Sequence, residues 1–152
     1  NQSSKNGRLI KIVPNALKLN LTNSLVAQRN NVINLPLKSR YYYHVEDSVV
    51  DVIIYEWNKA FEAKDFTELE KIQKKNTKYH KIYVKKFNLI ASYLTSIYGE
   101  AIEGDGQIRE EEFINGFSRW YSIYKWKVEE EFYELELSLI PNSSYRVRLK
   151  VY

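Results

Sequence analysis

The stretch 104–113 holds the residues whose types and spacing come closest to a chemical site. Gly104 and Gly106 flank Asp105, and Glu112 follows seven residues after that aspartate. Carboxylate oxygens are the ligands that hard divalent cations prefer, and glycines allow the sharp turn that such a loop needs. The spacing therefore predicts a divalent-cation site formed by Asp105 and Glu112.

The same stretch resembles the second half of an EF-hand calcium loop. If Ala101 is position 1, Asp105 and Gly106 take positions 5 and 6, and Glu112 takes the bidentate position 12. Position 1 normally supplies a carboxylate, which Ala101 lacks, and the sequence contains no second loop of this kind. The alternative is a glycine-rich turn followed by a helix over 109–117, whose acidic start favours the helix dipole. The missing carboxylate favours this alternative and leaves calcium as a secondary hypothesis.

No other group of residues in the sequence predicts catalysis. The chain has no cysteine, which excludes disulfides, zinc–thiolate sites and thiol catalysis. Its two histidines, His44 and His80, show no spacing typical of a metal site or a catalytic triad. We therefore expect a protein that is not an enzyme and that has no cofactor apart from the calcium considered above.

A candidate interaction site is the run of Arg40, Tyr41, Tyr42 and Tyr43. Tyrosine and arginine are enriched in the cores of protein–protein interfaces. Alternating basic and aromatic residues are also typical of surfaces that bind single-stranded nucleic acid. The chain has no nucleic-acid-binding motif, and acidic residues interrupt its basic helical segments. The sequence therefore favours other proteins as partners, including a second copy of the chain, over nucleic acid.

Composition indicates one globular domain. The 152 residues are 44% hydrophobic and 28% charged, with a net charge of +4. No apolar run approaches the ~20 residues that span a bilayer, so we expect no membrane span in this sequence. The absence of cysteine agrees with an exported protein. It does not assign a compartment by itself, and an upstream anchor is compatible with the sequence.

Periodicity predicts an α+β fold. Residues 1–45 read as an extended arm, with short strands at 8–13 and 17–21, and residues 46–152 read as a single α+β domain. Apolar residues recur at helical spacing over 47–64, where Trp57 lies on the apolar stripe. Further helices are expected at 67–75, 79–98 and 109–117. The prediction is three to four helices packed on a curved antiparallel sheet.

The C-terminal third alternates apolar and polar residues and predicts three strands near 120–128, 133–139 and 145–151. If the apolar sets of the last two strands share a face, Leu137 lies opposite Val147 and Glu136 opposite Arg148. Glu134 then faces Lys150. The last two strands are therefore predicted to form an amphipathic hairpin with complementary charges on its outer face.

The segment 52–66, with Trp57, Ala60 and the Lys64–Asp65 step, resembles the first helix of the NTF2-like superfamily. The strand at 145–152 is similar to late strands of that superfamily, and the layout resembles VirB8-like periplasmic domains. This resemblance implies an NTF2-like cone and an extracytoplasmic location, periplasmic or at the cell surface. It also implies a role in a bacterial secretion or conjugation machine.

Together these observations predict a non-enzymatic domain for protein–protein interaction or assembly, in a bacterial cell envelope. The alternative is a small-ligand-binding or calcium-modulated NTF2-like domain. Fold alone does not decide between them, because one fold hosts many functions.

Overall fold

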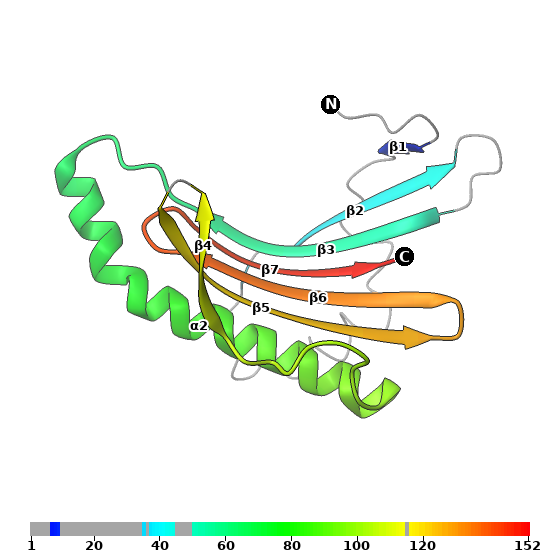
Figure 1. Ribbon diagram of the computed structural model, residues 1–152. Helices are drawn as coiled ribbons and strands as arrows, with labels where there is room; N and C mark the ends of the chain where they lie inside the picture. The colour runs from blue at the N-terminus through cyan, green and yellow to red at the C-terminus, as the bar shows by residue number, and fades with distance from the viewer. Residues whose placement is uncertain (1–6, 10–34, 36, 45–49, 115) are drawn as a thin grey trace.

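A single antiparallel sheet carries most of the described structure (Figure 1). The computed structural model describes residues 7–9, 35, 37–44, 50–114 and 116–152. The strands lie in the order β1-β2-β3-β7-β6-β5-β4, and each neighbouring pair is antiparallel. They are β1 (Gly7–Leu9), β2 (Leu37–His44), β3 (Val50–Ala60), β4 (Arg109–Ile114), β5 (Phe117–Val128), β6 (Glu131–Ile140) and β7 (Ser144–Val151). The sheet is curved, and the helix α2 crosses one of its faces.

The long helix α2 (Phe66–Tyr98) is defined at both ends by local interactions. The carboxylate of Asp65 accepts a hydrogen bond from the backbone N–H of Glu68 at 2.8 Å, which caps the first turn. Gly99 ends the helix with a φ of 81°, a conformation that glycine adopts at little cost. The indole N–H of Trp126 donates to the Gly99 carbonyl oxygen at 3.1 Å, so the helix end is attached to β5.

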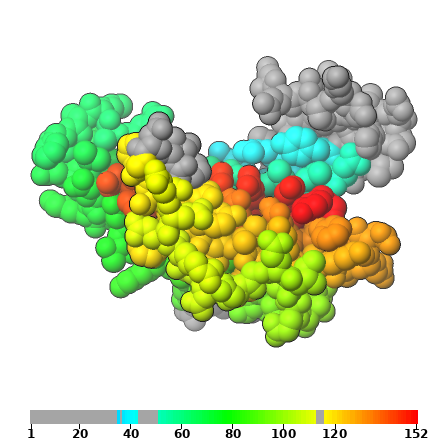
Figure 2. All heavy atoms as spheres, viewed as in Figure 1, coloured from blue at the N-terminus to red at the C-terminus, as the bar shows by residue number. Residues whose placement is uncertain are grey.

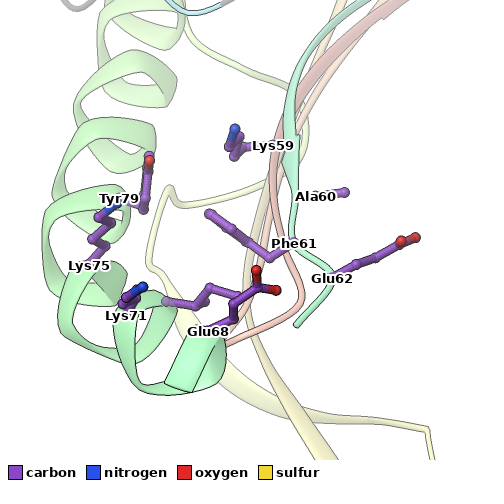
Figure 3. A pocket seen from close by; sticks show the side chains of 9 residues that line it. Lys59, Ala60, Phe61, Glu62, Glu68, Lys71, Lys75 and Tyr79 are labelled. Carbon is purple, nitrogen blue, oxygen red and sulfur yellow. The ribbon is translucent and has the colours of Figure 1, made fainter. Parts of the chain in front are cut away.

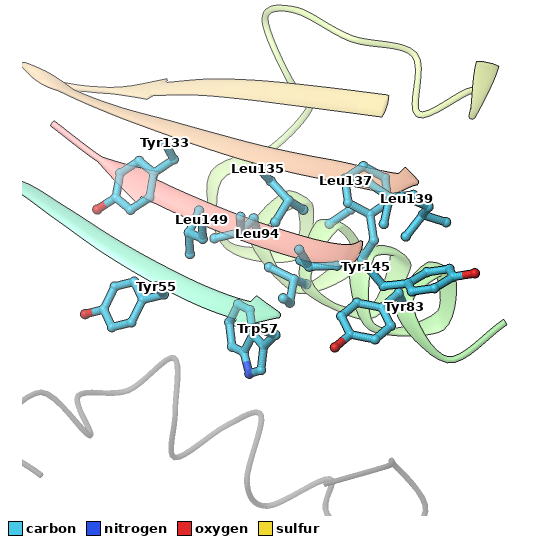
Figure 4. Close-up of a cluster of buried hydrophobic side chains, with 14 of the residues drawn as sticks. Tyr55, Trp57, Tyr83, Leu94, Tyr133, Leu135, Leu137, Leu139, Tyr145 and Leu149 are labelled. Carbon is cyan, nitrogen blue, oxygen red and sulfur yellow. The ribbon is translucent and has the colours of Figure 1, made fainter. Parts of the chain in front are cut away.

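The core lies between α2 and the face of the sheet that this helix covers (Figure 4). Tyr83, Phe87, Ile90 and Leu94 repeat at helical spacing, and their side chains are fully buried. The buried side chains from the sheet are Tyr55, Trp57, Trp126, Tyr133, Leu135, Leu137, Leu139, Tyr145, Val147 and Leu149. Fully burying a large apolar side chain contributes about 1.5–3 kcal/mol, so this interface supplies most of the driving force for folding.

The predicted register of the C-terminal hairpin is confirmed. In the β6–β7 pair, Leu137 lies opposite Val147, Glu136 opposite Arg148 and Glu134 opposite Lys150. The predicted shared face of the preceding strand is confirmed as well, since the even-numbered residues 120–126 of β5 lie opposite odd-numbered residues of β6. Alternation with a period of two fixed these positions, because a shift by one residue would expose the apolar set.

The expected layout of three to four helices packed on a curved sheet in an NTF2-like cone is wrong. Residues 50–60 of the expected first helix form strand β3. The two helices expected at 67–75 and 79–98 are one continuous helix, and residues 109–114 of the fourth form strand β4. The described part of the chain is therefore mostly sheet, with a single helix.

The misassigned segment 50–60 can be explained by its residue types. Its apolar residues fit a helical stripe, but they also place Ile53, Tyr55 and Trp57 at every second position. Branched and aromatic side chains favour strands, where they pack against neighbours on both sides. In β3, Trp57 lies opposite Leu37 of β2 and Val147 of β7, in the interior of the sheet.

The expected arm contributes to the same sheet. Residues 37–44 form β2, which pairs with β3 along its length, and residues 7–9 form the short strand β1. The expected strand at 17–21 lies outside the described residues, as does most of the one at 8–13.

The first turns of α2 project beyond the core, at the left of Figures 1 and 2. All buried residues of the helix lie between Ile82 and Leu94. Asn76 attaches the projecting part to the β6–β7 turn. Its amide nitrogen donates to Asn142 Oδ1 at 2.6 Å, and its Oδ1 accepts from the hydroxyl of Tyr145 at 2.8 Å. One amide thus attaches both the turn and the last strand to the helix.

We expect Asn76→Ala to lower the free energy of unfolding by about 1–2 kcal/mol, because it leaves part-buried polar groups without their partners. Asn88→Ala is the matched control, since Asn88 lies on the same helix with an exposed side chain. Urea unfolding followed by circular dichroism measures both. Equal stabilities for the two variants would contradict the role of Asn76.

Candidate functional site

The strands place alternate side chains on two faces, and α2 covers only one of them. Odd-numbered residues of β3, β6 and β7 point toward the helix, as do even-numbered residues of β5. We call the opposite side the open face, and among the described residues no helix packs on it. A row across its centre runs through Lys38, Glu56, Arg148, Glu136 and Ile123.

On the described strands of the open face basic side chains outnumber acidic ones by nine to four, and the loop acids Glu103 and Asp105 pair with two of the nine. The cations are Lys38, Arg40, Arg109, Arg119, Lys125, Lys127, Arg146, Arg148 and Lys150, and the carboxylates are Glu56, Glu111, Glu134 and Glu136. The net charge of the whole chain is +4. The helix α2 on the other side is basic as well, with seven lysines and two glutamates, so the open face is one of two basic surfaces.

The two central acids of this face lie beneath the cations. Glu56 and Glu136 have exposed fractions of only 5% and 8%, whereas the side chains of Arg146 and Arg148 are 33% and 28% exposed. One oxygen of Glu136 accepts from Arg146 at 2.6 Å and the other from Arg148 at 2.8 Å. The surface that this part of the face presents is therefore more basic than its residue count implies.

The pKa of Glu136 reflects the competition between burial and these arginines. Burial raises the pKa, but the charges and hydrogen bonds of Arg146 and Arg148 outweigh burial, so the carboxyl pKa is lowered. Glu136 therefore stays ionised at neutral pH. Glu56 is anchored in a similar way, since its Oε1 accepts from the Asn58 amide at 3.1 Å and lies 3.5 Å from Arg40 Nη2.

Aromatic rings and lysines meet at one end of the open face. Phe132 and Tyr152 stack with ring centroids 5.7 Å apart and an interplanar angle of 19°. The ammonium of Lys150 lies 4.3 Å from the centre of the Tyr152 ring, and that of Lys127 lies 5.5 Å from the Phe132 ring. Neither lysine has an ion pair with a described carboxylate. Their charges are therefore available to a partner.

The structure separates the predicted interaction residues. Tyr41 points toward the core, and its side chain is buried. Arg40 and Tyr42 lie on the open face, opposite Ile54 and Val52 of β3. The side chain of Tyr43 lies outside the described part. Two of the four residues thus belong to the basic face, while Tyr41 packs near Tyr55, where burial and then Tyr41 raise the pKa of Tyr55 to about 12.

The predicted calcium ligands Asp105 and Glu112 have separate protein partners. Asp105 accepts from Arg109 Nη1 at 3.1 Å and from the Gln107 N–H at 2.9 Å, and these contacts lower its pKa. Glu112 lies on β4 and accepts from the Gly116 N–H at 3.1 Å. Among the described residues no group of three or more metal-ligand side chains occurs. The calcium site therefore stays a prediction from the sequence.

The loop that carries Asp105 runs along β5. A bridge pairs Glu103 with Lys125, and the Lys125 ammonium lies 2.8 Å from Glu103 Oε2. Gly104 has a φ of 96°, and a Cβ at this position would collide with the backbone carbonyl of Ile123. The glycine is therefore needed for close approach between two backbones, which the cation-loop interpretation did not consider.

His80 has a structural contact. Its ring lies edge-on to Trp120, with ring centroids 5.8 Å apart, and burial lowers its pKa. The side chain of His44 lies outside the described part.

Sequence reasoning missed Glu56 and the Phe132–Tyr152 pair. Glu56 was assigned to a helix, so its place beside Arg148 could not be recognised. Phe132 could have been found from the alternation, because it is an aromatic residue in the phase that otherwise holds Glu134 and Glu136.

Comparisons with known protein families, characterised proteins and solved structures found no match to this chain. No described helix is both long and apolar enough to cross a membrane.

Proposed function

We propose that this chain is a non-enzymatic interaction domain whose open face binds an acidic partner protein. The observation that carries this proposal is the depth at which the charges of this face lie. Glu56 and Glu136 are buried, whereas the arginines paired with them remain partly exposed. A partner that approaches this face meets cations first. Complementary charge speeds the encounter and excludes partners of the wrong sign.

A second copy of the chain is a poor occupant of this face. In a symmetric dimer the same patch would lie on both subunits. Two copies of this face, each with an excess of positive charge, would repel, and desolvation would add to the cost. The self-association that the sequence allows would therefore have to use another surface.

A protein fits this face better than nucleic acid. Arg146 and Arg148 already donate to Glu136, which limits what they offer to carboxylates and phosphates alike, so charge does not distinguish these two partners. The face also holds the aliphatic side chains of Ile54 and Ile123. Apolar patches among charges are typical of protein–protein interfaces. The envelope location and the secretion or conjugation role stay predictions from the sequence.

The test uses fluorescein-labelled poly-L-glutamate as the acidic probe, followed by fluorescence anisotropy at about 50 and 150 mM salt. The variant is Lys38→Gln, Lys127→Gln and Lys150→Gln combined, because removing these lysines leaves no described acid without a partner. The control combines Lys74→Gln, Lys78→Gln and Lys81→Gln, which are exposed on α2 and change the net charge equally. We expect the open-face variant to bind about tenfold more weakly, at roughly 0.5 kcal/mol for each lysine removed.

The affinity of the control for poly-L-glutamate should stay within about twofold of that of the unmodified protein. Equal weakening of both variants would contradict the proposal, because it would show attraction to net charge alone. Single- and double-stranded oligonucleotides are titrated in parallel. Tighter binding of an oligonucleotide than of poly-L-glutamate, lost in the open-face variant, would instead assign the face to nucleic acid.

A further inference from the structure

A cleft of about 360 Å³ lies between the end of β3 and the projecting first half of α2 (Figure 3). It lies apart from the open face, on the side of the sheet where the helix packs. Its lining comprises Lys59, Ala60, Phe61, Glu62, Glu68, Lys71, Ile72, Lys75 and Tyr79. This volume is in the range of small-molecule sites in proteins.

The walls of the cleft are fixed by the fold. Lys71, Lys75 and Tyr79 follow one another at intervals of four residues, so they form one stripe of α2 that faces the strand end. The backbone N–H of Phe61 donates to the Ser143 carbonyl oxygen at 2.8 Å, which holds the opposite wall against the β6–β7 turn. Asn76 holds the helix to the same turn. The β6–β7 turn therefore holds both walls of the cleft in place.

The floor of the cleft is apolar and aromatic. The rings of Phe61 and Tyr79 lie 5.1 Å apart, and each lies within 6 Å of the Tyr145 ring. Ile72 completes this floor. Aromatic edges and faces offer a planar ligand well-defined contacts.

The charges at the rim favour an anion. Lys59, Lys71 and Lys75 have no ion pair with any described carboxylate. Of the two acids in the lining, Glu68 is engaged at the helix start, where its Oε2 accepts from the Lys64 N–H at 2.9 Å. The side chain of Glu62 points away from the lysines in Figure 3. The Glu68 carboxylate keeps its negative charge, so three lysines against this one inward carboxylate leave an excess of positive charge in the cleft.

We propose that this cleft binds an aromatic organic anion, with its ring on the Phe61–Tyr79 floor and its acid group among the lysines. A carboxylate, a sulfonate or a phosphate ester would supply the same negative oxygens. Neither part of the site suffices alone, because exposed lysines bind small anions weakly and the aromatic floor gives a neutral ring no charged contact. This site does not depend on the function of the open face.

The experiment is a titration with naphthalene-2-sulfonate, followed by backbone amide shifts in two-dimensional NMR. We expect a Kd on the order of 1 mM, with the largest shifts at Phe61, Ile72 and Tyr79. Sodium sulfate and 2-naphthol are titrated separately, as the acid group without the ring and the ring without the acid group. Each should bind at least about tenfold more weakly.

The double substitution Lys71→Gln and Lys75→Gln should weaken the binding of naphthalene-2-sulfonate at least fivefold. This is on the order of what two charge-assisted contacts contribute. The matched control is Lys74→Gln with Lys78→Gln, which removes the same charge from the same helix outside the cleft. The Kd of this control for naphthalene-2-sulfonate should stay within about twofold of that of the unmodified protein. Equal weakening of both variants, sulfate binding as tightly as the naphthalene compound, or shifts centred on another surface would each overturn the site.

Discussion

Glu136→Ala is expected to lower the free energy of unfolding by about 3 kcal/mol. The substitution removes the acceptor of two hydrogen-bonded arginines and leaves their positive charges side by side over a buried position. Removing one partner from a buried ion pair costs about 3–5 kcal/mol. We expect the lower end of that range, because Arg146 and Arg148 are partly exposed to water.

The effect of Glu136 should also depend on pH. Its pKa in the folded state is lowered, because the arginines outweigh the effect of burial. A lowered folded pKa gives a contribution that is present above the unfolded pKa, near 4.3. That contribution is lost as the pH falls through the folded pKa. The difference in stability between the unmodified protein and Glu136→Ala should therefore shrink in acid.

Urea unfolding at pH 7, 5, 4 and 3 measures this difference. Glu134→Ala is the control, since Glu134 is on the same strand and face but has no ion pair with a described residue. Its cost should stay below about 1 kcal/mol at every pH. A Glu136→Ala cost that is the same at pH 7 and pH 3 would show that lost packing, not charge, explains the effect.

Leu94→Ala is expected to cost about 3 kcal/mol of stability. Leu94 is fully buried between α2 and the sheet, and a leucine-to-alanine change in a core loses both transfer free energy and packing. For a chain of this size, the melting temperature should fall by about 6–12 °C. Differential scanning calorimetry gives this shift directly.

Ile97→Ala provides the comparison, because Ile97 lies one turn further along the same helix and is 51% exposed. Its melting temperature should change by less than about 2 °C, which corresponds to a surface substitution. Similar losses at both positions would mean that α2 rests on the sheet along a different stripe from the one described.

The C-terminal strands could be predicted from the sequence because their alternation has a period of exclusively two. Over 131–140 and 144–151 no helical stripe competes, and the acid–base pairs on the outer face agree with only one register. Glu136 opposite Arg148 was therefore predictable as a pair. The burial of Glu136 was not predictable, because it depends on the two arginine side chains that contact it.

The segment 50–60 could not be assigned in the same way, because Ile53 and Ile54 are adjacent and fit either period. A strand within a sheet can carry apolar residues on both faces, and such a run cannot be told from a buried helix by periodicity. The expected break between 75 and 79 was wrong for a different reason. Asn76 and Thr77 are weak helix formers, but without glycine or proline there they did not end the helix.

Only part of the candidate site could be predicted from the sequence. Arg40 and Tyr42 were recognised from their residue types, and both lie on the open face. The concentration of charge there depends on which strands are neighbours. The order that places β3 beside β7 brings residues about ninety positions apart into one row, as with Glu56 and Arg148. Local patterns carry no information on that order.

The projecting start of α2 should tolerate amino-acid substitutions that the buried core does not. Apart from the residues that line the cleft, its solvent-facing residues before Tyr79 make no contribution to the buried layer, and one amide and one cap fix its position. Substitutions there should accumulate in descendants of this sequence with little loss of foldability. The molecule can therefore acquire new surface chemistry at this end while its interior stays the same.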